Sequence, residues 1–215
     1  MRYRDRAEAG IRLAEQLAHL KPANPVVVGL PRGGVVVAAE VAKVLDAPLD
    51  VILVRKLGVR FQPELAMGAI GEGGVRIIDQ TMVRTAGLTE KDIQVVEERE
   101  QANLQRAAET FRGDKPPLDM SGQVVLIVDD GIATGATVAA ACEVARQRGV
   151  ERLVVAAPIG ASGAIAKLRL LTDETVCPAS DQFMSISQYY VDFSPVSDHE
   201  VFTCLEEAKR RVGGG

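Results

Sequence analysis

Short apolar runs alternate with longer amphipathic stretches along most of this chain. The run from Pro25 to Leu30 is too short for a helix and rich in β-branched residues, which is typical of a buried parallel strand. The strands are expected at 25–30, 49–54, 124–128 and 153–157, with helices between them at about 35–45 and 135–148. This repeated strand–helix–strand order predicts an α/β fold with a doubly wound, mainly parallel sheet. Ligands bind such sheets outside the carboxyl ends of the strands.

Further elements are expected on both sides of these units. Apolar residues at helical spacing predict an amphipathic helix over about 4–20, ending before Pro22. A helix near 161–171 and a short strand around 175–177 continue the alternating pattern. A last helix is expected to be capped by Ser197 to Glu200 and to run to about Arg211.

An insertion separates the two strand–helix–strand units. Residues 65–70 and 75–79 flank a glycine-rich turn at 71–74, which predicts a β-hairpin. Thr89 and Asp92 have the spacing of a capping box, and a narrow apolar stripe then runs through a charged segment that ends near Arg112. This long helix packs either against its own core or against another subunit, as in a homodimer.

Composition restricts the class of protein. Hydrophobic residues make up 47% and charged residues 25% of 215 residues, which indicates one soluble globular domain. The formal charge of −4 and the pI near 5.4 provide no broad positive field, so nucleic acid is not an expected partner. Three widely spaced cysteines without a CxxC pair indicate reduced thiols in or near the core. No signal peptide or membrane-spanning run is apparent, so we expect a cytoplasmic protein without a membrane partner.

One segment combines residues suited to binding a sugar phosphate. The strand at 124–128 is followed by Asp129 and Asp130 and then by small and hydroxylic residues that lead into a helix. The amides of residues 133–137 would lie at the N-terminus of that helix, which favours a phosphate, and Gly135 lets the backbone approach it. The paired carboxylates precede this turn, where the vicinal hydroxyls of a ribose would lie. The alternative is a strand that ends in acidic residues before an ordinary helix cap.

Other phosphate-binding motifs are missing from the sequence. There is no GxxxxGK[ST], and no GxGxxG opens the first helix of the α/β core. Nucleoside triphosphate and dinucleotide binding therefore lack their usual support.

Residues 124–137 resemble the 5-phosphoribosyl 1-diphosphate (PRPP) signature of type I phosphoribosyltransferases, in particular uncharacterised bacterial members. The resemblance implies Mg²⁺-dependent transfer of the 5-phosphoribosyl group from PRPP to a nitrogen acceptor, a nucleobase, with release of diphosphate. It implies that Asp129 and Asp130 hold the ribose, and that Mg²⁺ binds mainly through PRPP, with these carboxylates as direct or water-mediated ligands. The phosphate-binding loop would consist of Ala133, Thr134, Gly135, Ala136 and Thr137.

Two positions of the signature depart from the common pattern. Gly131 stands where an aliphatic residue or a serine is more usual. Ala133 stands where related enzymes that use 6-oxopurines commonly have aspartate, which makes hypoxanthine or guanine an unexpected acceptor.

The resemblance implies two further groups of site residues. A diphosphate-binding loop after the first core strand corresponds to Arg32, Gly33 and Gly34, although Pro-Arg-Gly-Gly is also a common turn. A mobile lid would begin after the second core strand, over about 57–64. Lys56 is the candidate that meets the diphosphate there, with Arg55 second, and the alternative is a pair of solvated charges at a strand end.

A variable hood over the sheet's carboxyl edge recognises the acceptor in this family. Phe183, Tyr189 and Tyr190 are the candidate acceptor contacts, and ordinary packing of these rings is an equal alternative. The resemblance thus predicts a single domain over 1–215, with a core at about 25–178, the insertion at about 57–115 and hood elements at about 179–211.

Three functions remain open from the sequence. The first is a phosphoribosyltransferase. The second is a PRPP-sensing regulator that keeps the fold and the pocket but transfers nothing. The third is a doubly wound domain for another phosphorylated ligand.

Overall fold

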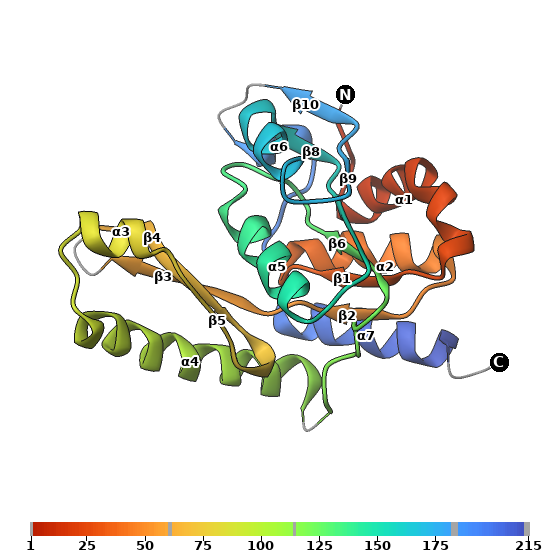
Figure 1. Cartoon of the computed structure of the whole chain (residues 1–215). Coiled ribbons are helices and arrows are strands. Elements are labelled where there is room, and N and C mark those ends of the chain that lie inside the picture. The colour runs from red at the N-terminus through yellow and green to blue at the C-terminus, as the bar shows by residue number, and fades with distance from the viewer. Residues whose placement is uncertain (1, 60–61, 114, 182–184, 213–215) are drawn as a thin grey trace.

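Five parallel strands form the central sheet of the computed structural model, which describes residues 2–59, 62–113, 115–181 and 185–212 (Figure 1). Their order across the sheet is β2-β1-β6-β7-β9. They are β1 (Val26–Gly29), β2 (Leu49–Val51), β6 (Val124–Val128), β7 (Arg152–Ala156) and β9 (Glu174–Val176). The expected α/β fold with a mainly parallel sheet is confirmed.

Helices cover both faces of this sheet, which explains the continuous apolar runs of its strands. Val27, Leu126 and Val154 face one cluster, to which the helices α1 (Arg6–Leu17), α2 (Gly33–Leu45) and α7 (Asp198–Val212) contribute. Val28 and Ile127 face the other cluster, which includes residues of α5 (Ala136–Gln147) and α6 (Ser162–Leu168). Because successive side chains of a strand point to opposite faces, every residue of β1 is buried.

The insertion forms an arm that extends from the central sheet (Figure 1). It consists of the antiparallel strands β3 (Val54–Val59), β4 (Gln62–Gly71) and β5 (Val75–Ile78), the short helices η2 (Glu72–Gly74) and α3 (Gln80–Thr85), and the long helix α4 (Glu90–Arg112). The predicted hairpin and long helix are confirmed, including the capping box of Thr89 and Asp92. The helix α3 was not predicted.

Two expectations about the start of the arm were wrong. The second core strand ends at Val51, and the chain pairs again from Val54 in β3. Residues 57–59 and 62–64, expected in an irregular lid, belong to β3 and β4, whereas residues 60 and 61 lie outside the described part. Leu57 and Val59 are buried, whereas Gly58 between them and Lys56 before them are half-buried. This alternation of buried and half-buried residues is too short to recognise as a strand in the sequence.

A buried ionic cluster fixes the arm to the core. Arg112, at the end of α4, donates from Nε to Asp50 Oδ1 in β2 over 2.9 Å, and its two terminal nitrogens bond Glu72 in the turn of the arm. Asp50 Oδ2 also accepts from the Leu118 amide over 2.8 Å. Because these charges are buried and mutually paired, they hold the end of α4, the turn of the arm and β2 in one arrangement.

The start of the described chain lies beside a segment close to residue 190. Tyr3 forms an isolated parallel bridge with Tyr190, which follows the short helix η3 (Ile186–Tyr189). Beside them, β8 (Ile159–Ala161) pairs in parallel with β10 (Ala179–Asp181), neither of which was predicted. The first helix ends at Leu17, and the 3-10 helix η1 (Ala18–Ala23) continues through Pro22, where the sequence predicted an end.

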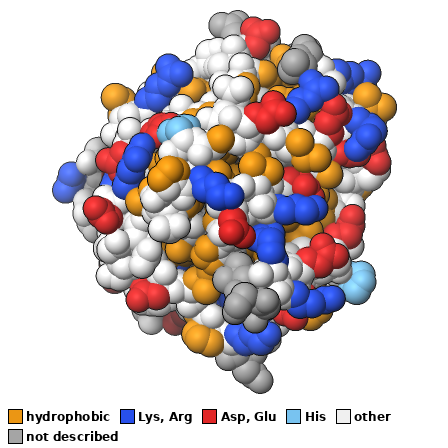
Figure 2. Space-filling model, turned by 90° about the vertical axis from the view of Figure 1, so that its right-hand side faces the viewer, with side chains coloured by type: hydrophobic (Ala, Val, Ile, Leu, Met, Phe, Trp, Pro, Cys, Tyr) orange, Lys and Arg blue, Asp and Glu red, His pale blue; other side chains and the backbone are white. Residues whose placement is uncertain are grey.

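Charges of both signs are mixed on one face of the molecule (Figure 2), and the three cysteines are unpaired. Acidic and basic side chains are interspersed on the face shown in Figure 2. Cys142 is buried, Cys177 and Cys204 are half-buried, and all three are free thiols. Among the described residues, no helix has both the length and the apolar character needed to cross a membrane.

Candidate functional site

The acidic pair lies at the carboxyl edge of the central sheet, directly after β6. The Asp129 amide bonds the Ala156 carbonyl oxygen over 3.2 Å, and Asp129 Oδ1 accepts from the Asp130 amide over 2.9 Å. Burial and, secondly, the charge of Asp130 raise the pKa of the Asp129 carboxyl well above its usual range. The site thus contains one carboxyl group whose ionised form is costly until a cation or hydroxyl donors approach it.

The loop between β1 and α2 lies against this pair with no room for side chains. A Cβ atom on Gly33 would lie 1.9 Å from Asp130 Oδ2, and one on Gly34 would lie 2.8 Å from the Val128 carbonyl oxygen. The peptide bond between Pro31 and Arg32 is cis. The two glycines are therefore required by contact with the acidic pair, which an ordinary turn would not demand.

The loop predicted to bind phosphate, residues 133–137, leads into α5 and is called the anion-binding loop here. Residues 133, 134, 136 and 137 are exposed, and Gly135 has φ +75°. The buried Ile132 amide donates to the Ile159 carbonyl oxygen over 2.9 Å, which anchors the loop to β8. Because α5 begins at Ala136, the amides of its first turn have no helical partners and are available to an anion.

The structure explains the unusual glycine after the acidic pair. A Cβ atom on Gly131 would lie 2.4 Å from Ile186 Cγ2, in η3. The helix η3 thus packs directly on the PRPP signature, at the position where a larger residue is more usual.

Arg6 is a site residue that the sequence did not reveal. It lies at the start of α1, and its Nε donates to Asp130 Oδ2 over 2.7 Å. Its guanidinium also lies over the ring of Phe193, 4.0 Å from the centroid. The Tyr190 hydroxyl donates to the Asp130 carbonyl oxygen over 2.7 Å. The charged segment around Arg6 contained no signal that distinguished this arginine from its neighbours.

Of the three aromatic residues predicted to contact the acceptor, two differ in burial and one lies outside the described residues. Tyr190 is only 1% exposed, and its ring packs between those of Tyr3 and Phe193, so it belongs to the packing of the hood. Tyr189, at the end of η3, is half-buried. Phe183 lies outside the described residues.

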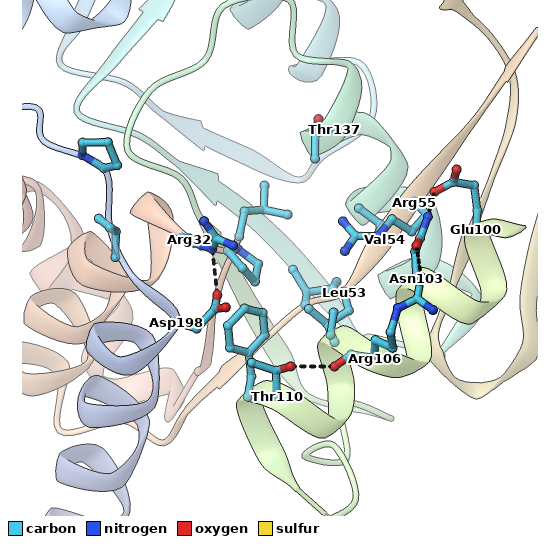
Figure 3. A pocket seen from close by; sticks show the side chains of 17 residues that line it. Arg32, Leu53, Val54, Arg55, Glu100, Asn103, Arg106, Thr110, Thr137 and Asp198 are labelled. Atoms are coloured by element: carbon cyan, nitrogen blue, oxygen red, sulfur yellow. Dashed lines mark hydrogen bonds and ion pairs between the residues drawn. The ribbon is translucent and has the colours of Figure 1, made fainter.

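A cavity of about 750 Å³ opens beside the β1–α2 loop (Figure 3). Its walls come from this loop, from residues 52–55 at the start of β3, from α4 and from the start of α7. Thr137 of the anion-binding loop also lines it. Arg32 lies on one side, where its Nε donates to Asp198 Oδ1 over 2.7 Å. The cavity therefore adjoins both phosphate-binding segments that the sequence predicted.

The structure distinguishes the two basic candidates of β3. Arg55 lines the cavity across from Arg32, and its buried Nε has no hydrogen-bond partner in the part of the chain that the structure describes (Figure 3). Lys56 is not part of the cavity wall, because successive side chains of a strand point to opposite sides. A donor of this kind is free to bond an acceptor of a molecule bound in the cavity.

One face of α4 completes the cavity with polar groups. The residues of this face that bear polar side chains are Glu100, Asn103, Arg106 and Thr110. Arg106 donates to Asn103 Oδ1 over 2.6 Å. The apolar stripe of α4 predicted only its packing face, yet these four residues are three to four positions apart, which indicates a second common face.

The acidic pair does not form a complete metal site by itself. Among the residues that the structure describes, no group of three or more His, Cys, Asp or Glu side chains could hold a metal ion. Mg²⁺ requires about six oxygen ligands and commonly takes several from substrate phosphates and water. Asp129 and Asp130 therefore offer only part of the oxygen ligands that such an ion requires.

The parallel sheet, the acidic pair, the adjoining loop at the start of α5 and the Gly-Gly loop after β1 together define the type I phosphoribosyltransferase class. Comparison with known families agrees, since a model described as the phosphoribosyl transferase domain matches residues 3–193. The chain belongs to this family.

Similar proteins extend the comparison. Proteins of two Mycobacterium tuberculosis strains, each provisionally named a phosphoribosyl transferase, are 50% identical to this chain over 207 residues. The match covers 96% of this chain and 47% of theirs, so the chain spans about half the length of these relatives. The crystal structure of TT1426 from Thermus thermophilus has a TM-score of 0.86 and 41% identity, covering 96% of this chain and 99% of that one. A ribose-phosphate pyrophosphokinase of Pyrococcus furiosus is 48% identical over 59 residues, 26% of this chain and 21% of its own.

Proposed function

We propose that this protein transfers the 5-phosphoribosyl group of PRPP to a nitrogen acceptor, a nucleobase, and releases diphosphate in a Mg²⁺-dependent reaction. The observation that carries the proposal is the meeting of three segments at one sheet edge: the acidic pair, the loop at 133–137 and the Gly33-Gly34 loop packed against the pair. Each segment matches one part of PRPP, namely ribose, 5-phosphate and diphosphate.

Different residues bind the 5-phosphate, the ribose and the diphosphate of PRPP. The amides of residues 133–137 and the hydroxyls of Thr134 and Thr137 bind the 5-phosphate. Asp129 and Asp130 accept hydrogen bonds from the ribose hydroxyls, directly or through waters of a bound cation. Mg²⁺, when present, neutralises the diphosphate and is held mainly by PRPP oxygens. Arg32 and the backbone of Gly33 and Gly34 contact the diphosphate.

A basic side chain of β3 completes the diphosphate site. Lys56 was the first candidate from the sequence, with Arg55 second. The direction of the side chains favours Arg55, which lines the cavity with an unpartnered Nε. Its planar guanidinium suits diphosphate oxygens better than a point charge does.

The chemistry needs positioning and charge stabilisation rather than a nucleophilic side chain. The acceptor nitrogen attacks C1 with its lone pair, the bond from C1 to the diphosphate oxygen breaks, and diphosphate leaves with that electron pair. The acceptor loses its N–H proton to solvent, and configuration at C1 is inverted. Arginines around the cavity stabilise the charge that develops on the leaving group.

The acceptor is the least constrained part of the reaction. Ala133 supports an acceptor other than hypoxanthine or guanine. Tyr189 remains a candidate contact because it is half-buried in the segment that covers Gly131. The polar face of α4 offers a second set of groups near the reacting centre.

A PRPP-sensing regulator is the second candidate. The observation in its favour is that Asp130 and Arg32 are already paired, with Arg6 and Asp198. A protein that binds PRPP without transferring its ribosyl group would have the same contacts.

Phosphorus NMR of the protein with Mg-PRPP, alone and with a panel of purine, pyrimidine and other nitrogen acceptors, tests the proposal. We expect diphosphate release that depends on the acceptor and is lost when Asp129→Asn and Asp130→Asn are combined. PRPP signals that broaden only with the wild-type protein, without release for any acceptor, would support the regulator. Signals that remain unperturbed would contradict both candidates and favour another phosphorylated ligand.

A further inference from the structure

Asp130 is held by a residue from outside the PRPP signature. Arg6 lies 124 positions earlier in the chain, and its Nε donates to Asp130 Oδ2 over 2.7 Å. The two side chains are only 11% and 15% exposed. Water competes weakly for such a pair, so the contact is stronger than a surface ion pair.

The guanidinium of Arg6 is itself fixed by two residues between η3 and α7, Phe193 and Ser194. Its Nη1 donates to the Ser194 carbonyl oxygen over 2.8 Å, and its Cζ lies 4.0 Å from the ring centroid of Phe193. The ring of Phe193 packs in turn against Tyr190, whose hydroxyl donates to the Asp130 backbone carbonyl. Both the side chain and the backbone of Asp130 are therefore positioned by the start of α1 together with residues 190–194.

The same carboxylate oxygen of Asp130, Oδ2, also faces the β1–α2 loop. The place of a Cβ on Gly33 lies 1.9 Å from Asp130 Oδ2 and 2.7 Å from Arg6 Nε. Arg6, Asp130 and Gly33 thus form one contiguous group, in which Arg6 occupies Oδ2. The Asp130 carboxylate also interacts with the neighbouring Asp129 carboxyl group, so Arg6 holds one member of the acidic pair.

We propose that Arg6 is a positioning residue for PRPP, which orients the Asp130 carboxylate so that it accepts from the ribose hydroxyls. This inference rests on the proposed function, because it assigns Asp130 to the ribose. Arg6 acts through Asp130 and does not itself touch the substrate. Loss of its hydrogen bond leaves Asp130 free to rotate, so each binding event must first order this carboxylate.

Calorimetric titration of the intact protein with Mg-PRPP tests the inference, since it gives the affinity and the number of sites separately. Arg6→Gln is expected to weaken PRPP binding about tenfold at unchanged stoichiometry. Arg6→Lys keeps the charge but cannot bond Asp130 and Ser194 with one planar group. The affinity of this variant for PRPP should therefore lie between those of the wild type and of Arg6→Gln. Arg4→Gln is the matched control, because Arg4 lies two residues away and its exposed side chain pairs with the neighbouring Asp5. It should bind as the wild type does.

The outcomes separate this inference from the function on which it rests. An Arg6→Gln protein that binds PRPP as tightly as the wild type, or more tightly, overturns the positioning role. So does a loss of stoichiometry at constant affinity, because this is the result of partial misfolding. If the wild-type protein binds no PRPP, the proposed function and the inference fail together.

Discussion

Gly33 and Asp130 are in such close contact that no side chain could be placed between them. A Cβ atom on Gly33 would lie 1.9 Å from Asp130 Oδ2 and 2.7 Å from Asp130 Cγ. The contact joins the loop assigned to diphosphate with the carboxylate assigned to ribose. The two halves of the proposed PRPP site are therefore coupled by packing, before any ligand binds.

Gly33→Ala is expected to weaken PRPP binding at least about tenfold. Its methyl group can be accommodated only if Asp130 moves or the β1–α2 loop shifts, and either movement misplaces a group that contacts the substrate. The dissociation constant for Mg-PRPP, measured by titration calorimetry, checks this prediction.

Gly163→Ala is the control for this substitution. Gly163 also lies near the start of a helix, and a Cβ there meets no atom within 4 Å. This variant should keep the wild-type affinity and be slightly more stable, since alanine favours a helix over glycine by up to about 1 kcal/mol. Equal affinities in the two alanine variants would show that the contact with Asp130 is unimportant for binding.

Gly131→Ser restores the residue type more usual at this position of the family, and we expect it to be harmful here. The new Cβ would lie 2.4 Å from Ile186 Cγ2, so η3 or the PRPP signature must move, at a cost of about 1–3 kcal/mol in unfolding free energy. Urea denaturation of the variant measures this cost.

The compensating change Ile186→Ala identifies the cause of that loss. In the double variant the side chain that meets the new Cβ is shortened, and the added penalty of Gly131→Ser should largely disappear. Strictly additive unfolding free energies would mean that the two residues do not interact, contrary to their contact in the structure.

The PRPP signature and the parallel core were accessible from the sequence because their information is local. The strand at 124–128, the acidic pair and the turn into α5 are contiguous, and buried parallel strands have continuous apolar runs. Arg6 was not accessible in this way. Its partners are Asp130 and the segment near Phe193, and neither spacing nor composition relates positions so distant in the chain.

The start of the arm was mispredicted for a different physical reason. The strand β3 buries only alternate residues from Leu57 onward, and a bulge interrupts its pairing with β4 between Leu57 and Val59. A short, irregular alternation of this kind resembles a loop in the sequence. The choice between Arg55 and Lys56 depended on the same strand, because its alternation decides which side chain faces the cavity.

Asp129→Asn is expected to stabilise the protein without ligand and to abolish phosphoribosyl transfer. Burial raises the pKa of this carboxyl, so the folded state binds its proton more tightly than the unfolded chain does. The stability that this group contributes is therefore lost as pH rises through the folded pKa, and the asparagine, which is never charged, avoids the loss. Thermal unfolding of both proteins at several pH values should show an advantage of the variant that shrinks as the pH is lowered. A variant that is less stable at neutral pH would contradict the assigned cost.

Arg55→Gln should reduce kcat/KM for PRPP by at least about tenfold, whereas Lys56→Gln should change it by less than about threefold. The reason is direction: Arg55 lines the cavity with a buried Nε that has no partner, and Lys56 projects from the other side of β3. The two substitutions remove one positive charge each from neighbouring positions, so long-range electrostatics affects both equally and each variant is the control of the other. Initial rates of diphosphate release over a range of PRPP concentrations provide the measurement. If Lys56→Gln is instead the more damaging change, the lysine predicted from the sequence contacts the diphosphate, and β3 must rotate or bend during the reaction to bring it there.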